Sequence, residues 1–424
     1  VKVHSFICDA PARAYIKCIK SHGGYSFCDK CVETGEYVQN RIIYKSVSAS
    51  RRTDLDFQLF IDEDHHTGIS PLSKLPIDLV TNFPIDYMHA VCLGVMRKLL
   101  NIWMCGNLKI RLPGRLINLI SERLIYYRKF IPVEFNRKSH RLTEFARWKA
   151  TEFKMFLIYL GPLALKDILP IALYENFLSF HCSIFILSSE KYINKLSTQL
   201  ANELLIMFIK HCENIYGSQF LIYNVHILCH LSNEVEKFGP LDNYSAFPFE
   251  NYLSSLKNLV RSPHKPLEQI FRRLKEIDVS NQDNILHHEI DNILLLFLEH
   301  NSEPFPDNNL YKYKMFKKIK YKNLIVCVWQ YRSADCYCYL KGKKMIQVHN
   351  ILLRRHDNIL FLYGKQFSSY YPYYIYPYNS KLTDIFRVKD LSNEFVIVQF
   401  EDVIAKCIVL PDENNFWVSF PLIH

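Results

Sequence analysis

The sequence predicts an α+β protein made of three regions of different character. A short apolar run followed by a helical pattern opens the chain, and residues 86–300 are largely helical in pattern. After residue 301, short runs rich in aromatic and β-branched residues recur at regular spacing. At 424 residues the chain is too long for one ordinary core, so we expect about two or three domains.

The composition is that of a basic globular protein. Hydrophobic residues make up 49% of the chain and charged residues 22%, which argues against disorder. The net charge of +10 favours a polyanionic partner, but a merely soluble basic surface explains it equally well. The 13 cysteines are scattered and follow no signal peptide, so we expect a reducing intracellular compartment. The apolar stretch Ile290–Leu298 is too short to span a bilayer, so no membrane association is expected.

A strand-to-helix junction carries the first candidate acid. Val1–Cys8 is expected to form a strand, and Pro11 suits the first turn of a helix that ends near Gly23 and Gly24. Asp9 lies at the junction. Because ligands of α/β folds gather at the carboxyl ends of strands, Asp9 is a candidate catalytic carboxylate.

The middle of the chain is predicted to be a large all-α insertion. Residues 40–85 look irregular, and after them no internal repeat is evident, which argues against a solenoid. Apolar residues at helical spacing predict helices over Met88–Leu99, Leu116–Tyr127, Phe145–Tyr159 and Tyr192–Ile215.

The C-terminal region is predicted to be a small β-barrel or sandwich behind a linker at residues 301–309, which is rich in Pro and Asn. Lys312–Lys322 carries six lysines and no acid, so it is either a phosphate-contacting strip or a solvated linker edge. The expected strands are Leu324–Tyr331, Tyr337–Leu340, Ile359–Tyr363, Glu394–Phe400, Ala405–Leu410 and Phe416–Phe420.

Two cysteines and two histidines have the donor types of a zinc site. Cys28 and Cys31 are spaced so that both thiolates can bind one ion from a tight turn. His226 and His230 would face the same way on a helix. The long stretch of chain between the pairs is unlike a zinc finger, so spacing alone favours two buried thiols and two ordinary helix histidines.

Two further helix starts carry candidate site residues. Glu250 opens a helix that is expected to run to Ser262. One face of this helix is expected to be buried. Glu250, Lys257 and Arg261 lie along another face. That face suits a metal-bound phosphate backbone, although a first-turn Glu beside a solvated basic face is the simpler interpretation. Asp86 and His89 begin another helix, where Asp86 is either an N-cap or a third carboxylate and His89 either a surface or an active-site residue. The stripe predicted to be buried consists of Phe249, Leu253, Leu256 and Val260.

Three blocks of sequence together resemble a known family. They are Cys-Asp-Ala-Pro-Ala-Arg with the Cys28/Cys31 pair (8–31), Phe-Pro-Ile-Asp-Tyr-Met-His-Ala-Val-Cys-Leu-Gly (83–94) and Phe-Pro-Phe-Glu-Asn-Tyr-Leu-Ser-Ser-Leu-Lys-Asn-Leu-Val-Arg (247–261). In combination they resemble eukaryotic cut-and-paste transposases of the CACTA-like (En/Spm) group, whose wider kin include the Transib and RAG recombinase lineage. The resemblance covers residues 1 to about 280.

The resemblance implies an RNase H-like core with an Asp-Asp-Glu triad and a helical insertion before the Glu. Asp9 then matches the second acid and Glu250 the third, and both would bind catalytic Mg²⁺ or Mn²⁺. The cysteine and histidine pairs match the structural zinc ligands of that lineage. The first Asp would lie upstream of Val1, so an N-terminally truncated and inactive chain is expected. In the alternative assignment, Asp9 is the first acid and Asp86 the second. We disfavour it, because the Cys pair follows Asp9 closely, as it does in the block of the family that carries the second acid.

The sequence therefore predicts four regions: a partial RNase H-like core (1–40), a mostly helical insertion (41–225), a return to the core with the His pair and final acid (226–300), and a β-rich module (301–424). The favoured function is that of a transposase-derived DNA-processing protein in the nucleus, with DNA as partner and homo-oligomerisation left open. The alternatives are a non-enzymatic DNA- or chromatin-binding protein and a protein-interaction scaffold.

Overall fold

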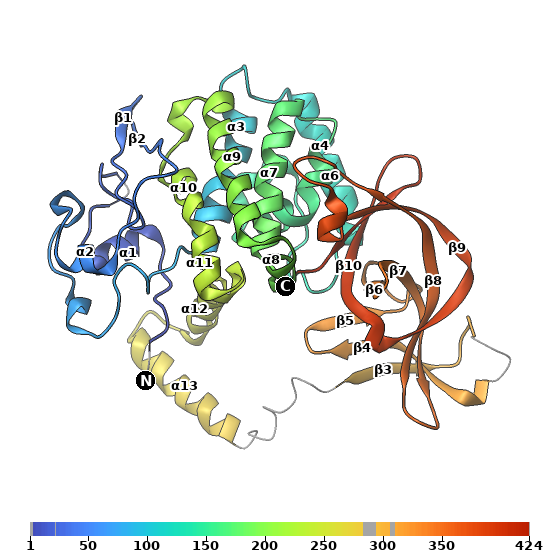
Figure 1. Cartoon of the computed structure of the whole chain (residues 1–424). Helices are drawn as coiled ribbons and strands as arrows, with labels where there is room; N and C mark the ends of the chain where they lie inside the picture. Colours follow the sequence, from blue (N-terminus) through green and yellow to red (C-terminus); the bar gives the residue numbers. More distant parts are fainter. Residues whose placement is uncertain (1–2, 22, 283–293, 306–309, 424) are drawn as a thin grey trace.

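The computed structural model describes residues 3–21, 23–282, 294–305 and 310–423. The fold is mixed α+β. Figure 1 shows an N-terminal segment on one side of a central helical body and a strongly curved antiparallel sheet on the other side. The N-terminal segment contains α1 (Ala10–Lys17), the hairpin β1 (Glu36–Val38) and β2 (Arg41–Ile43), α2 (Asp54–Gln58) and the 3-10 helices η1 (Glu63–His65) and η2 (Pro71–Lys74).

The strand predicted at Val1–Cys8 is wrong for the residues that the structure describes there, 3–8. Only Cys8 pairs, through a parallel bridge to Ile85, and the Phe6 N–H donates to the Asn82 carbonyl at 2.8 Å. A ladder needs a run of paired residues, and this extended segment has one. Within residues 3–282, as far as they are described, β1–β2 is the one sheet, so the RNase H-like core stays a prediction.

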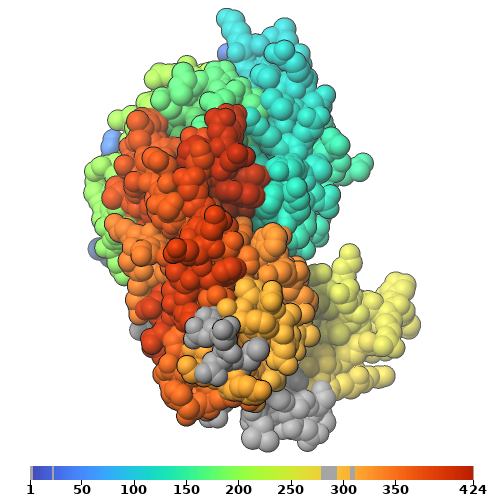
Figure 2. Space-filling model, turned by 90° about the vertical axis from the view of Figure 1, so that its right-hand side faces the viewer, coloured from blue at the N-terminus to red at the C-terminus, as the bar shows by residue number. Residues whose placement is uncertain are grey.

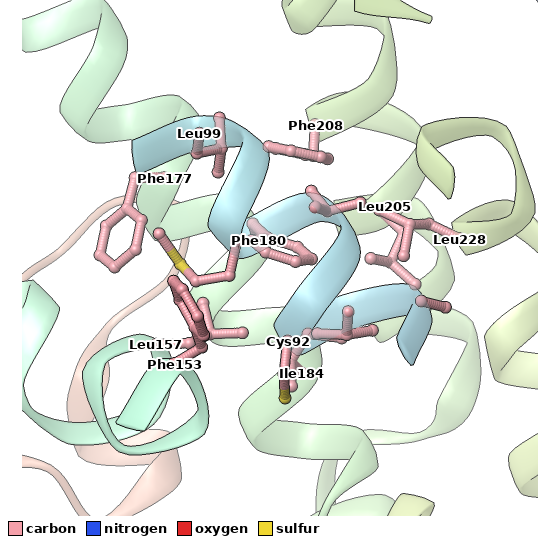
Figure 3. Close-up of a cluster of buried hydrophobic side chains, with 14 of the residues drawn as sticks. Cys92, Leu99, Phe153, Leu157, Phe177, Phe180, Ile184, Leu205, Phe208 and Leu228 are labelled. Carbon is pink, nitrogen blue, oxygen red and sulfur yellow. The ribbon is translucent and has the colours of Figure 1, made fainter. Parts of the chain in front are cut away.

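The helical body is built around a helix that is buried on all sides. Every residue from Phe177 to Leu187 in α7 is buried, as expected for a helix at the centre of a bundle. Phe180 of α7 stacks on Phe208 of α9 with ring centroids 4.7 Å apart (Figure 3). The elements are η3 (Met88–Met96, a π-helix), α3 (Arg97–Cys105), α4 (Gly114–Tyr127), η4 (Arg128–Phe130), η5 (Leu142–Arg147), α5 (Ala150–Met155), η6 (Phe156–Leu160, a π-helix), α6 (Gly161–Leu165), α7 (Ile171–Leu187), α8 (Glu190–Leu196), α9 (Thr198–Tyr216), η7 (Ser218–Phe220), α10 (Tyr223–His226), η8 (Ile227–His230), α11 (Leu231–Phe238) and η9 (Leu241–Tyr244).

The helix predicted at Leu116–Tyr127 corresponds to α4, whereas the three others are divided. Met88–Leu99 falls into η3 and the start of α3. Phe145–Tyr159 falls into η5, α5 and η6, and Tyr192–Ile215 is broken at Ser197, whose φ of 72° ends α8 before α9 begins. Among the described residues, no single helix is long and apolar enough to cross a membrane. α7 and α8 together reach that length and composition, but the two helices are bent by 109° relative to each other.

Two helices project from the body. α12 (Phe247–Leu259) and α13 (Pro266–Gln282) lie apart from the bundle, in yellow in Figures 1 and 2. The buried stripe predicted for α12 (Phe249, Leu253, Leu256, Val260) is wrong: Phe249 is 54% exposed, Leu253 is 58% exposed, and none of the four is buried. An amphipathic pattern specifies an apolar face but not a neighbour that covers it.

Six C-terminal strands close into an antiparallel barrel. The path β7–β6–β10–β11–β9–β8 returns to β7 through the pairing of β7 with β8. At this seam Gly364 lies against the Gln347 carbonyl, where a Cβ would approach the oxygen to 2.0 Å. The barrel strands are β6 (Tyr337–Leu340), β7 (Lys344–Arg354), β8 (Leu360–Pro372), β9 (Phe386–Gln399), β10 (Val403–Pro411) and β11 (Trp417–Pro421), and β3 (Leu295–His300), β4 (Tyr313–Tyr321) and β5 (Leu324–Cys327) extend the sheet beyond β7, with the 3-10 helices η12 (Leu310–Lys312), η13 (Ser333–Asp335), η14 (Ser380–Thr383) and η15 (Phe400–Asp402) in the connections.

Some predictions for this region fall partly outside the described residues. Residues 290–293 of the apolar stretch and 306–309 of the linker are not described, and Leu295–Leu298 belong to β3. Most of the lysine-rich segment forms β4, which pairs with β3 on one side and with β5 and β7 on the other, so it is part of the sheet rather than a linker edge. Its contact with phosphates stays a prediction.

The barrel and the helical body share one hydrophobic core. Tyr373, Tyr374 and Phe420 of the barrel region belong to the same buried cluster as α7. The Lys406 ammonium, fully buried, bridges Asp335 of the barrel (2.6 Å) and Glu134 of the body (2.7 Å). We therefore expect the two parts to unfold together.

Candidate metal and carboxylate site

The four predicted zinc ligands lie together. Each of Cys28, Cys31, His226 and His230 offers one ligand atom, and these atoms lie within 4.8 Å of one another in a buried cluster. The His226 Nε2 is 3.3 Å from each sulfur, the two sulfurs are 3.5 Å apart, and the His230 Nε2 is 3.6 Å from the Cys28 sulfur. Residues from the two ends of a long helical insertion therefore meet at one point.

The donor set and its spacing fit zinc. With Zn–S bonds of about 2.3 Å and Zn–N bonds of about 2.0 Å, ligand atoms of a tetrahedral site should lie roughly 3.3–3.8 Å apart. The His226 Nδ1 faces the Ser46 carbonyl at 3.1 Å, which orients the ring so that Nε2 points at the sulfurs. Four protein ligands make a closed site, so the zinc that it could hold would be structural.

The cluster also favours a thiolate. Burial alone would raise the pKa of the Cys28 thiol, but the hydrogen bond from the Cys31 thiol and the charges of His226 and His230 outweigh burial and lower that pKa well below its usual value. Zinc binds thiolate rather than thiol, so the lowered pKa of Cys28 favours zinc binding at neutral pH.

The two residues between the cysteines anchor the loop through buried ion pairs. The Asp29 carboxylate contacts both the Arg13 guanidinium and the Lys17 ammonium of α1 at 3.1 Å. The Lys30 ammonium contacts Glu234 of α11 at 2.8 Å. Burial would raise the pKa of Asp29, but Arg13, Lys17 and Lys30 hold it well below its usual value, so Asp29 is ionised.

Arg13 connects the cysteine loop to the candidate acids. Besides the Asp29 contact, its guanidinium donates to the Tyr223 hydroxyl at 2.5 Å and to the Pro84 carbonyl at 3.3 Å. Tyr223 begins α10, which carries His226, and Pro84 lies just before Asp86. One buried side chain thus ties together the segments that carry the metal ligands and the acids.

Asp9 and Asp86 lie side by side because the residues before them pair. Cys8 and Ile85 form a parallel bridge, so both carboxylates follow paired residues at the same end. Both, with His89 and Arg13, line a small cavity of about 30 Å³. Asp9 also caps α1 by accepting from the Ala12 N–H at 2.8 Å through Oδ1, and its Oδ2 has no protein partner within the described part of the chain.

Asp86 acts as a structural connector. It is 2% exposed, and its oxygens accept from the backbone N–H groups of Met88 (3.2 Å) and His89 (2.9 Å) at the start of η3. Its Oδ1 also accepts from the Ala246 N–H at 2.7 Å, just before α12, and its Oδ2 contacts the His89 imidazole. The N-cap interpretation therefore fits Asp86 better than that of a free third carboxylate.

Glu250 lies in the third segment, whose start is held by Asp86. The hydrogen bond to Asp86 raises the pKa of His89; burial opposes this, and the negative charges of Asp86, Asp9 and Glu250 add to it. Glu250 is exposed in the first turn of α12, whose start is held by Asp86. The start of the third segment is thus held beside Asp86, and the charges of Asp9 and Glu250 act on the same imidazole.

Asp9 and Glu250 have carboxylate oxygens without protein partners within the described part of the chain, whereas Asp86 does not. Hard cations such as Mg²⁺ and Mn²⁺ bind through one or two carboxylates and keep several waters. Asp9 has an oxygen free of protein partners, as far as the chain is described, and the Glu250 carboxylate is exposed. Both Asp86 oxygens are occupied by backbone N–H groups and His89.

The two cations predicted to bind DNA are exposed near this site. Lys257 is on α12, but Arg261 lies beyond its end, because the helix stops at Leu259 rather than at Ser262. Sequence reasoning missed the buried charges Arg13, Lys17, Asp29 and Lys30. The available signal was Asp29 and Lys30 between the two cysteines. Charged residues beside buried metal ligands are themselves buried and therefore need oppositely charged partners.

A protein-family comparison matches residues 299–422 to a Domain of unknown function (DUF8592). The match covers β3 from Glu299 onward and the barrel, and it leaves the metal cluster and the carboxylates outside. Searches of curated proteins and of solved structures give no match.

Proposed function

We propose that this chain belongs to a transposase-derived DNA-processing protein of the CACTA-like type, whose site for divalent cations includes Asp9 and Glu250. The observation that carries the proposal is that the Cys8–Ile85 bridge and the hydrogen bond from the Ala246 N–H to Asp86 bring all three segments of the resemblance together at Asp86. The Cys28, Cys31, His226 and His230 cluster would hold a structural zinc beside it. DNA as partner and the nucleus as location are part of the proposal.

The chemistry assigned to each residue follows from its surroundings. A bound divalent cation would polarise a phosphodiester and activate a water or a 3′-hydroxyl. Asp9 and Glu250 would hold that cation, and Asp86 would position Glu250 by anchoring the start of α12. His89 would supply positive charge next to the acids, and Lys257 with Arg261 would contact the DNA backbone.

Mn²⁺ binding, followed by electron paramagnetic resonance, tests the acids directly. We expect Asp9→Asn and Glu250→Gln each to weaken Mn²⁺ binding by at least about tenfold, since each removes one charged ligand. Asn caps a helix about as well as Asp, so Asp9→Asn should leave α1 intact. Glu276→Gln on exposed α13 is the matched control and should bind Mn²⁺ like the wild type. Wild-type affinity in both site variants would remove Asp9 and Glu250 from a common site.

Salt-dependent DNA binding tests the second half of the proposal. Removing two phosphate contacts with Lys257→Ala and Arg261→Ala should reduce the slope of log affinity against log salt by about 1.8 on duplex DNA. Lys109→Ala with Arg111→Ala, two exposed cations between α3 and α4, is the control. DNA binding without Mn²⁺ binding would favour the non-enzymatic alternative, and the absence of both would favour an interaction scaffold.

A further inference from the structure

A cleft of about 920 Å³ lies directly beside the acids. Asp9 and His89 both line it. The other lining residues come from the loop at Gly23 and Tyr25, the β1–β2 hairpin, η3 and α3, and the start of α10. Ligand pockets span roughly 300–1,000 Å³, so this cleft can enclose a ligand with several rings.

The cleft has an excess of positive charge. Arg41 of β2 and Arg97 of α3 line it, both are exposed, and neither forms an ion pair within the described part of the chain. Burial, together with the charge of Arg41, lowers the pKa of neighbouring Lys98 to about 8. Asp9 is the one carboxylate among the described lining residues. Two unpaired lining cations against one lining carboxylate favour an anionic ligand.

The cleft also presents exposed aromatic rings. Tyr25 is 50% exposed and Tyr37 is 61% exposed, and both line it. Tyr37 lies directly opposite Ile42 in the hairpin, and its hydroxyl donates to the Asn40 Oδ1 at 2.9 Å. Gln39 and Asn40 both have positive φ, as in the two-residue turns that match the twist of a hairpin. Rings fixed and exposed in this way are platforms on which planar groups can stack.

We propose that this cleft binds an unpaired, single-stranded segment of DNA. Arg41 and Arg97 would contact its phosphates, and Tyr25 and Tyr37 would stack on its bases. In a duplex the faces of each base are covered by its neighbours, so stacking on tyrosine requires unstacked bases. The inference rests on the proposed function, because Asp9 would face the strand that the cleft holds. It assigns the cleft to the substrate strand rather than to the flanking duplex.

Fluorescence anisotropy with a labelled oligothymidine, in buffer without added divalent cation, tests the cleft. We expect Tyr37→Ala to weaken binding of the single strand by about 5- to 150-fold and to leave binding of an equally long duplex unchanged. Arg41→Ala with Arg97→Ala should reduce the salt slope for the single strand by about 1.4. Tyr126→Ala and Arg115→Ala, at exposed positions of α4 outside the cleft, are matched controls.

The outcome separates this inference from the proposed function. Single-strand affinity unchanged in the Tyr37 and arginine variants, or reduced equally by the α4 controls, overturns the cleft assignment even if Mn²⁺ binds through Asp9 and Glu250. Loss of single-strand binding in the cleft variants alone supports the assignment. If Mn²⁺ binding is then insensitive to the acid variants, the cleft stands and the proposed chemistry fails.

Discussion

Replacing both cluster thiols would test the metal cluster most directly. Cys28→Ser with Cys31→Ser leaves two imidazoles, which cannot complete a tetrahedral site. The four ligands are 0–5% exposed, so no solvent is available to take the place of the missing sulfurs. We expect purified wild-type protein to contain about one zinc per chain and the double variant to contain none.

The loss of stability should be large and located in two distant segments. Structural zinc contributes on the order of 10 kcal/mol to folding in zinc-finger peptides, and a metal at 1,000 times its Kd stabilises by about 4 kcal/mol. A loss of about 4 kcal/mol or more is therefore expected at micromolar zinc. Because the cluster joins the loop at 28–31 to residues 226–230, hydrogen exchange should rise in both segments together.

Zinc content by a colorimetric chelator assay, thermal melting and hydrogen-exchange mass spectrometry give three independent measurements. Cys105→Ser is the matched control, because Cys105 is an exposed free thiol at the end of α3. It should keep the zinc and the melting temperature of the wild type. Full zinc content in the double variant, or equal loss in the control, would refute the assignment of the four ligands.

Two further predictions concern buried ionisable groups. Lys406→Met leaves the fully buried Asp335 and the largely buried Glu134 without their shared cation, so it should lower the free energy of unfolding by about 3–5 kcal/mol in denaturant titrations. Lys341→Met, at an exposed ion pair on the barrel, should change it by less than about 1 kcal/mol, and equal effects would contradict this reasoning. Burial lowers the pKa of His181 to about 4 in the folded protein. Below pH 6.5 the unfolded chain binds a proton at His181 that the folded protein does not bind, so the free energy of unfolding falls by about 3 kcal/mol between pH 6.5 and pH 4. His181→Gln should flatten that part of the stability profile. An unchanged profile would exclude His181 as its source.

The sequence predicts those site residues whose side-chain types indicate a zinc site. It does not predict the role of a residue when that role depends on which distant segments lie next to it. The Cys and His pairs were found by spacing within each pair, and their meeting across the insertion followed from the resemblance. The role of Asp86 could not be assigned from the sequence, because an Asp at the start of a helix is suited both to capping that helix and to binding a metal. The Ala246 N–H that occupies its oxygen comes from a distant segment.

The fold was predictable where a pattern is local. α1 begins after Asp9 with Pro11 in its first turn, as its sequence predicts, because capping involves residues within one turn. β7 was missed, because His349 and Asn350 interrupt its apolar run; Asn350 is nevertheless buried, and its side-chain NH₂ donates to the Pro304 carbonyl at 3.1 Å. The exposure of α12 could not be foreseen, because it depends on which elements pack against that helix.

The buried charges explain how a structural cluster can position a distant acid. Asp29 is 1% exposed and forms ion pairs with Arg13 and Lys17 of α1, so moving α1 away from the cysteine loop would leave unpaired charges in the interior at a cost of several kcal/mol. Arg13 also binds the Pro84 carbonyl and the Tyr223 hydroxyl, so the same movement would break contacts with the segments before Asp86 and His226. Asp9, at the start of α1, is thus fixed relative to the cluster through ion pairs rather than through a shared sheet.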